Sequence, residues 1–306
     1  MGEATLQTAP FFVVGSERSG TTMIRLMLNR HSRLCVPPES HFVTRLYDRL
    51  HTPPAPAAFL DALGAERRFQ EWQLPLDAIT IPPSAPATWA VLFDAVFRAY
   101  AATQGKVRWG DKTPVYVTRL ETLRAIFGPD IKVVHIVRDG RDVAASLKGV
   151  GWNARGVAEN ARTWRHDVEA ARAFGRRAPA TYHEVVYERL VAEPERELRT
   201  VCAHLGEAFE PGMLQFFDDA EGAIPAHRRQ WHRNAARPVN DTAIGRWRRD
   251  LSPGEIAQFE WIAGDLLSAL GYARSGISPV RMLPLVVGNA ATRLRGRFAR
   301  PSAPPA

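Results

Sequence analysis

A glycine-containing loop follows an apolar stretch near the start of the chain, where residues 11–22 read FFVVGSERSGTT. A Walker A loop requires a lysine that reaches the β- and γ-phosphates, followed by a hydroxyl that binds magnesium. Gly15 and Gly20 keep the spacing of its two glycines, but Thr21 stands at the lysine position and the positive side chain, Arg18, lies inside the loop. This pattern is typical of an anion site that works without magnesium-triphosphate chemistry.

The residues after the loop have the apolar spacing of a helix over 21–30. The first N–H groups of a helix point out of its end, and the helix dipole favours negative charge there. We therefore predict that a phosphate or sulfate group is bound by the Arg18 side chain together with the backbone of Ser19, Gly20, Thr21 and Thr22.

A second group of residues that could bind an anion follows the uninterrupted apolar stretch 131–137. Arg138 comes directly after it, where a Walker B aspartate would otherwise stand, and Ser146 lies eight residues further on. An arginine binds a phosphate through two hydrogen bonds, and a serine hydroxyl adds a neutral one. Both can face one ligand only if Arg138 lies in the loop before the helix. The alternative is an ion pair of Arg138 with Asp139 or Asp142.

Lys112 stands in the sequence WGDKTPV, which closes another candidate strand at 106–109. Asp111 and Thr113 are residue types that cap helices, and Pro114 suits the first position of a helix. A lysine at the end of a strand beside an anion site can neutralise charge that develops during a reaction. We therefore include Lys112 among the candidate catalytic residues.

The elements that must position these residues alternate between strands and helices. Strand patterns at 11–14, 131–137 and 182–187 are separated by helical patterns at 87–104, 156–177, 190–205 and 252–270. Such alternation predicts an α/β fold with a central parallel sheet flanked by helices, and ligands at the carboxyl ends of the strands. We expect a single domain over 1–273, with a helical, Pro-rich cap insertion at 51–105.

The excess of positive charge is mostly a property of the last residues. The chain of 306 residues has a net charge of +8, yet residues 1–273 carry 34 Lys and Arg against 32 Asp and Glu. This distribution gives no reason to expect nucleic-acid binding, which places basic residues on the folded face. Residues 274–306 are interpreted as a basic, partly ordered tail, or as a weak peripheral contact with anionic lipid.

The cysteine content and the apolar runs bear on the location of the protein. Cys35 and Cys202 are the only cysteines, and the sequence has no C-x-x-C pair. No apolar run has the length of a membrane span, and the first residues lack the layout of a secretory signal. We therefore expect a cytoplasmic location.

Together the three motifs resemble the sulfotransferases that use 3′-phosphoadenylyl sulfate, particularly the tyrosylprotein-sulfotransferase-like branch. The resemblance spans residues 10–250. The loop at 18–22 is similar to the 5′-phosphosulfate loop of that family, and residues 136–146 are similar to its 3′-phosphate motif. The resemblance implies a P-loop NTPase-like sulfotransferase fold and 3′-phosphoadenylyl sulfate (PAPS) as co-substrate.

The same resemblance implies the roles of four further residues. Glu39 and Lys112 match the catalytic glutamate and lysine of the branch, since Glu39 lies 21 residues after Arg18 and Lys112 lies 26 residues before Arg138. Tyr187, in VVYERL, resembles the tyrosine near the nucleotide, and Arg237, in RPVN, resembles the late basic loop that closes over it.

A sulfuryl transfer from PAPS to an acceptor hydroxyl follows from these assignments. Glu39 takes the proton of the hydroxyl, while Lys112 and Arg18 neutralise the leaving phosphate, which makes a metal unnecessary. His41, two residues beyond Glu39, is the alternative base.

Two other classes of function remain at this stage. A P-loop-like small-molecule kinase explains the loop but lacks its lysine. A non-catalytic nucleotide-binding module explains both anion motifs but gives Lys112 and Glu39 no role. The acceptor can be a small molecule, glycan, lipid or peptide hydroxyl, and neither it nor the oligomeric state is readable from the sequence.

Overall fold

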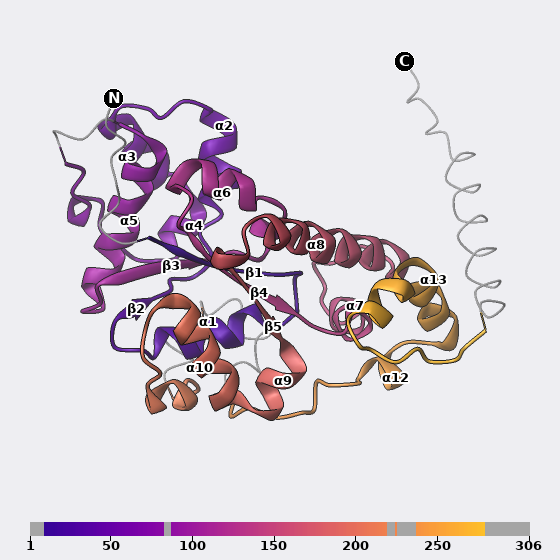
Figure 1. Cartoon of the computed structure of the whole chain (residues 1–306). Helices are drawn as coiled ribbons and strands as arrows, with labels where there is room; N and C mark the ends of the chain where they lie inside the picture. The colour runs from indigo at the N-terminus through magenta and orange to yellow at the C-terminus, as the bar shows by residue number, and fades with distance from the viewer. Residues whose placement is uncertain (1–8, 83–86, 219–223, 225–236, 279–306) are drawn as a thin grey trace, which may run out of the picture. The chain divides into compact units, whose positions relative to one another are not determined.

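A computed structural model describes residues 9–82, 87–218, 224 and 237–278 (Figure 1). Five strands form one sheet in which all neighbouring pairs are parallel, in the order β2-β3-β1-β4-β5. The strands are β1 (Phe11–Val14), β2 (Leu34–Cys35), β3 (Arg108–Lys112), β4 (Lys132–Val137) and β5 (Tyr182–Val186). The predicted α/β fold with a central parallel sheet is confirmed.

Alternation along the central strand β1 separates two apolar layers. Phe11 and Val13 belong to one buried cluster, and Phe12 and Val14 belong to another, as expected when successive side chains point to opposite faces. The Phe11 layer contains α1 (Thr21–Asn29), α9 (Tyr187–Ala192), α10 (Pro194–Leu205) and η5 (Pro211–Gln215). The Phe12 layer contains α5 (Trp89–Thr103), α6 (Leu120–Phe127) and the second half of α8 (Val157–Arg177).

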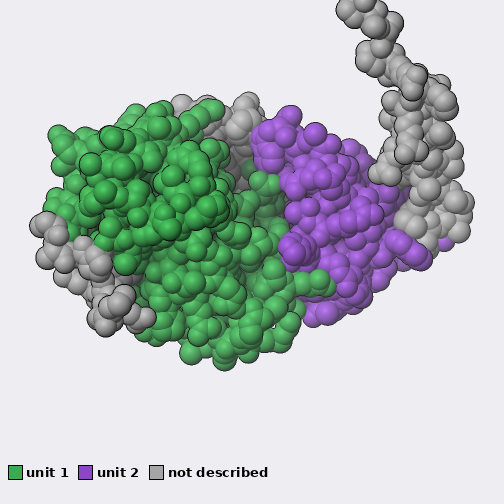
Figure 2. Space-filling model, turned by 90° about the horizontal axis from the view of Figure 1, so that it is seen from above, with its two compact units in different colours: residues 1–138, 167–241 green, residues 139–166, 242–306 purple. Residues whose placement is uncertain are grey.

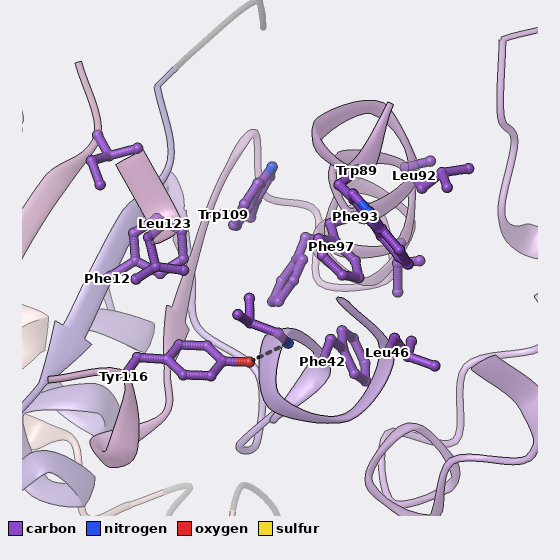
Figure 3. Packing of buried hydrophobic residues seen from close by; sticks show 14 of the residues in the cluster. Phe12, Phe42, Leu46, Trp89, Leu92, Phe93, Phe97, Trp109, Tyr116 and Leu123 are labelled. Carbon is purple, nitrogen blue, oxygen red and sulfur yellow. Dashed lines mark hydrogen bonds between the residues drawn. The ribbon is translucent and has the colours of Figure 1, made fainter. Parts of the chain in front are cut away.

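Aromatic rings dominate the Phe12 layer (Figure 3). The Trp109 ring on β3 stacks on Phe97 of α5 with ring centroids 4.4 Å apart, and the Trp109 indole N–H donates to Asp94 Oδ1 at 2.7 Å. Phe42, which follows β2, packs against Phe93 of the same helix. Helix α5 thereby holds both the third strand and the segment that follows the second.

Short helices complete the segments that follow β2 and β3, and one more directly precedes β5. Residues 51–105 include several of these together with α5. Their bounds are η1 (Val43–Tyr47), α2 (Asp48–Leu50), α3 (Pro56–Gly64), α4 (Arg67–Gln70), η2 (Leu76–Ala78), η3 (Pro114–Thr118) and η4 (Pro179–Thr181).

The chain divides into two compact units (Figure 2). Unit 1 comprises residues 1–138 and 167–241 and contains the sheet. Unit 2 comprises residues 139–166 and 242–306 and contains α7 (Gly140–Lys148), the first half of α8, α12 (Trp247–Asp250) and α13 (Pro253–Ala269). The tail prediction falls mainly on residues 279–306, which lie outside the described residues.

Unit 2 is held together by buried ionic contacts at the start of α7. Arg141 forms ion pairs with Asp139 and Glu260, both at 2.7 Å, and its guanidinium lies 4.0 Å above the Trp247 ring. The fully buried Asp142 accepts hydrogen bonds from the backbone N–H groups of Gly245 and Trp247.

Candidate active site

Predicted site residues lie at or after the carboxyl ends of all five strands, at one edge of the sheet. All of these residues belong to unit 1. The glycine loop follows β1, Glu39 follows β2, Lys112 is the last residue of β3, Arg138 follows β4 directly, and Tyr187 follows β5. Because parallel strands end at the same edge, residues distant in the sequence meet there. The requirement that Arg138 lie in a loop is met.

The glycine loop has the backbone conformation that a compact turn before a helix requires. Arg18 and Gly20 adopt positive φ angles of 69° and 105°. A Cβ atom added to Gly20 would stand 2.5 Å from the Tyr187 ring, so only glycine fits there. The Ser19 N–H donates to Ser16 O at 3.1 Å, which closes the turn.

Two buried hydroxyls of this loop have no hydrogen-bond partner among the described residues. They are the Oγ atoms of Ser16 and Ser19, and both side chains are buried. Buried polar atoms are usually satisfied, and exceptions call for a ligand, water or ion. Helix α1 begins at Thr21, and its first N–H groups have no partner within the helix. These donors fit an anionic group such as a phosphosulfate.

Arg138 joins the loop to Tyr187. Its Nη1 donates to the backbone carbonyl of Arg18 at 3.1 Å, and its guanidinium lies 4.5 Å from the centre of the Tyr187 ring. Tyr187 also packs against Gly20. The structure therefore brings together Arg18, Gly20, Arg138 and Tyr187, which were predicted from three separate parts of the sequence.

Lys112 and Glu39 form a close ion pair. Lys112 Nζ donates to Glu39 Oε1 at 2.6 Å and to Thr22 Oγ1 at 3.4 Å. Lys112 is 4 % exposed and Glu39 is 15 % exposed at their side chains. The lysine thus stands between the glutamate and the start of α1, within reach of both.

The electrostatics of this pair keep Glu39 ionised. Burial opposes its ionisation, but Lys112 and a hydrogen bond from His41 hold the Glu39 pKa well below its usual range. Burial lowers the pKa of Lys112, and the charge of the buried Arg25 acts in the same direction, while Glu39 raises it. Each member of the pair therefore favours the charged form of the other.

His41 stands on the other oxygen of the same carboxylate. Its Nε2 lies 3.4 Å from Glu39 Oε2, and Arg68 Nη2 lies 4.0 Å from that oxygen. His41 has a positive φ of 56°, a strained backbone for this residue type. Both candidate bases therefore lie at one place.

A buried network that the sequence did not reveal lies next to the pair. Ser40 Oγ donates to Asp111 Oδ2, and Thr113 Oγ1 donates to Asp111 Oδ1 at 2.9 Å. Of the two cap-type residues, Thr113 is the N-cap of η3 with Pro114 at its start, whereas Asp111 belongs to β3 and its carboxylate binds these two hydroxyls. Burial raises the Asp111 pKa to about 6. The only signal in the sequence was the position of these hydroxyls next to Glu39 and Lys112.

The two remaining predicted residues lie elsewhere in the chain. Ser146 is a buried residue of α7 and belongs to unit 2. Arg237 is exposed and belongs to an irregular segment of unit 1. Of the carboxylates considered as partners of Arg138, Asp139 binds Arg141, and Asp142 binds the backbone of Gly245 and Trp247.

Comparison with known proteins identifies the class. Residues 10–211 match the model of the sulfotransferase family, and the chain belongs to that family. It is similar to the sulfotransferase domain of the olefin synthase of Synechococcus PCC 7002, with a TM-score of 0.62, 21 % identity, and coverage of 89 % of this chain and 99 % of that one. The predicted sulfotransferase fold is therefore confirmed.

Two curated relatives are longer than this chain. The nodulation protein NoeE of Sinorhizobium fredii is 27 % identical over 295 residues, which cover 86 % of this chain and 66 % of NoeE. The protein-tyrosine sulfotransferase of Drosophila melanogaster is 24 % identical over 275 residues, which cover 85 % of this chain and 51 % of that protein. The chain thus spans between half and two thirds of their lengths.

Proposed function

We propose that this protein transfers a sulfuryl group from 3′-phosphoadenylyl sulfate to an acceptor hydroxyl. The observation that carries the proposal is the Glu39–Lys112 ion pair at the end of the glycine loop, with Thr22 in reach of the same lysine. A base and a cation in contact at the start of an anion-binding helix suit the transfer of an anionic group to a hydroxyl. Membership of the sulfotransferase family supports this reaction class.

The donor supplies an activated sulfuryl group on a phosphosulfate anhydride, together with a separate 3′-phosphate. Ser19, Gly20, Thr21, Thr22 and Arg18 would hold the phosphosulfate. Arg138 would hold the 3′-phosphate, and Tyr187 and Arg237 would line the nucleotide. The unpartnered Ser19 hydroxyl is the observation in this structure that fits such an anion.

Glu39 and Lys112 would act on opposite ends of the transferred group. Glu39 is ionised and can accept the proton of an acceptor hydroxyl, a role worth about 10²–10⁴-fold in rate. Lys112 already reaches toward the loop through Thr22 and can donate to the oxygen that leaves, assisted by Arg18. In-line transfer of this kind depends on positioning and charge neutralisation.

The acceptor carries a hydroxyl, as the tyrosine named for the Drosophila relative does. Among the residues described here, no group of three or more His, Cys, Asp or Glu could hold a metal ion, and no helix is long and apolar enough to cross a membrane. The kinase alternative needs a loop lysine, which Thr21 replaces, and finds no support in the site.

Thermal shift measurements test the donor assignment. Adenosine 3′,5′-bisphosphate without magnesium is expected to raise the Tm, and adenosine 5′-monophosphate is expected to raise it less. Arg138→Ala should remove most of the difference between the two nucleotides, since one charge-assisted hydrogen-bonding group is worth about 1.5–3 kcal/mol. The exposed Arg199→Ala is the control. Stabilisation by magnesium-ATP alone would contradict the proposal and favour the kinase.

A further inference from the structure

Glu39 lies between two points at which its segment is fixed. On one side, the Trp72 indole N–H donates to the Pro38 carbonyl at 3.0 Å. On the other side, Ser40 is fully buried and its hydroxyl donates to Asp111. The reactive carboxylate therefore extends from a backbone that is held immediately before and immediately after it.

Lys112 is held in the same way and by the same network. Asp111 precedes it and Thr113 follows it, and the hydroxyl of Thr113 donates to the Asp111 carboxylate. Thr113 Oγ1 also accepts the N–H of Ser40 at 3.2 Å. Since successive residues of a strand point to opposite faces, Asp111 and Thr113 point away from the side on which Lys112 meets Glu39.

Tyr116 completes this arrangement from η3. Its hydroxyl lies 3.2 Å from Ser40 Oγ and accepts the backbone N–H of Val43 at 2.9 Å (Figure 3, dashed line). Ser40, Asp111, Thr113 and Tyr116 are all buried. We call these four residues the Asp111 clamp. They join the segment after β2 to the end of β3 directly behind both reactive groups.

We propose that the Asp111 clamp positions Glu39 against Lys112, and that Ser40 and Thr113 are positioning residues for the transfer reaction. The clamp acts through the backbone and touches neither the donor nor the acceptor. His41, whose φ is positive, lies between Ser40 and Val43, which are both held by hydrogen bonds of the clamp, and such a strained residue persists only where its surroundings hold it. This inference rests on the proposed function of Glu39 and Lys112.

The direct test is the titration of the Glu39 carboxyl by NMR with ¹³C-labelled glutamate, its signal assigned with Glu39→Gln. A clamp that presses Glu39 onto Lys112 keeps the Glu39 pKa low, because a nearby opposite charge lowers a carboxyl pKa by about 1–3 units. Ser40→Ala and the isosteric Thr113→Val should each raise the Glu39 pKa by about one unit or more. Thr113→Ser keeps the hydroxyl and should leave it unchanged.

Kinetics give the second readout. Ser40→Ala and Thr113→Val should lower kcat by about tenfold or more, with KM for the donor within about threefold of wild type, because misplaced groups slow the reaction without removing the donor site. Tyr182→Phe removes a buried hydroxyl from the β5 side of the sheet and is the control, with kcat and the Glu39 pKa unchanged.

Three results would overturn the proposal. They are an unchanged Glu39 pKa in a folded Thr113→Val protein, a Thr113→Ser protein as impaired as Thr113→Val, or an equal loss of kcat in Tyr182→Phe. Wild-type protein that transfers no sulfuryl group would contradict the proposed function instead, and the titration comparison would still report on the clamp.

Discussion

At the scale of single residues, the site differs from a Walker A loop in the origin of its cation. Thr21 replaces the lysine of the loop, and Lys112 is supplied by β3 instead. A lysine within the loop would be committed to phosphate, whereas Lys112 also reaches Glu39. In the proposed reaction, Lys112 can therefore contact both the anionic donor and Glu39.

Glu39→Gln tests the base directly. We expect turnover to fall by about 10² or more, because a neutral amide cannot accept the acceptor proton. Affinity for adenosine 3′,5′-bisphosphate, measured by calorimetry, should stay within a few fold, since the contacts proposed for the nucleotide come from the glycine loop and Arg138, not from Glu39. His41→Ala is the matched comparison. If His41→Ala abolishes turnover and Glu39→Gln retains it, His41 is the base.

At the scale of elements, the glycine loop, α1 and α9 form one tightly fitted unit. Gly20 precedes α1, and the Tyr187 ring that begins α9 packs directly onto it. A side chain at this position would displace either the ring or the loop. The shape of the glycine loop is therefore set partly by Tyr187, the residue that follows β5.

Gly20→Ala should destabilise the protein and weaken nucleotide binding. The added Cβ would meet the Tyr187 ring at 2.5 Å, and overpacking of this kind costs about 1–3 kcal/mol beyond the backbone strain. Gly128→Ala is the control, because Gly128 also has a positive φ but no atom within 4 Å of the new Cβ. Denaturant unfolding measures both. Equal losses in the two variants would show that the ring contact is unimportant.

The sequence predicts elements of this site better than contacts between them. The strand ends before Arg18 and Arg138 were predictable, because the apolar runs that lead to them are short and continuous. The end of β3 was not, since its last residues include Asp111 and Lys112, and buried charged residues look like a loop. The Ser40–Asp111 contact depends on β2 lying beside β3, and the order of strands in a sheet cannot be predicted from the local sequence pattern.

The same limit explains the break between α9 and α10. A single helix was expected over 190–205, but α9 begins already at Tyr187 and α10 begins after it at Pro194. Proline suits the first position of a new helix and cannot continue the previous one. Tyr187, expected in a strand, thus becomes the first residue of a helix.

At the scale of the whole molecule, the sheet contains a buried histidine that makes stability depend on pH. His135 on β4 is fully buried, and its Nδ1 lies 2.6 Å from Tyr182 Oη. Burial lowers its pKa from 6.5 to about 4, with Arg172 acting in the same direction and Glu184 against it. The histidine is neutral in the folded protein near pH 7.

We expect the stability that His135 contributes to be fully present above pH 6.5 and to be lost as the pH falls toward 4. The unfolded chain binds the proton more tightly than the folded protein, so acid favours unfolding, by about 3 kcal/mol in total. His135→Asn should remove this dependence. Unfolding free energies of both proteins, measured from pH 4 to 7, should therefore differ by a pH-dependent amount.

Asp111 acts in the opposite direction over a similar range, since its pKa is raised. It is present in both proteins, and its effect cancels in their difference. A difference between wild type and His135→Asn that is constant with pH would contradict the prediction.

The strand order also bears on how this chain matures while it is being translated. The first strand becomes the middle of the sheet, and Phe11 pairs with Gly110 on one side and Lys132 on the other. All neighbouring pairs among the five described strands are parallel, so none of these pairs can form as a hairpin. A nascent chain that has not yet reached residue 187 already contains Glu39 and Lys112, but it lacks the Tyr187 ring that packs against the glycine loop. Such non-local pairing is slow and leaves strand edges exposed, which makes the emerging chain a natural client for chaperones until its fifth strand leaves the ribosome.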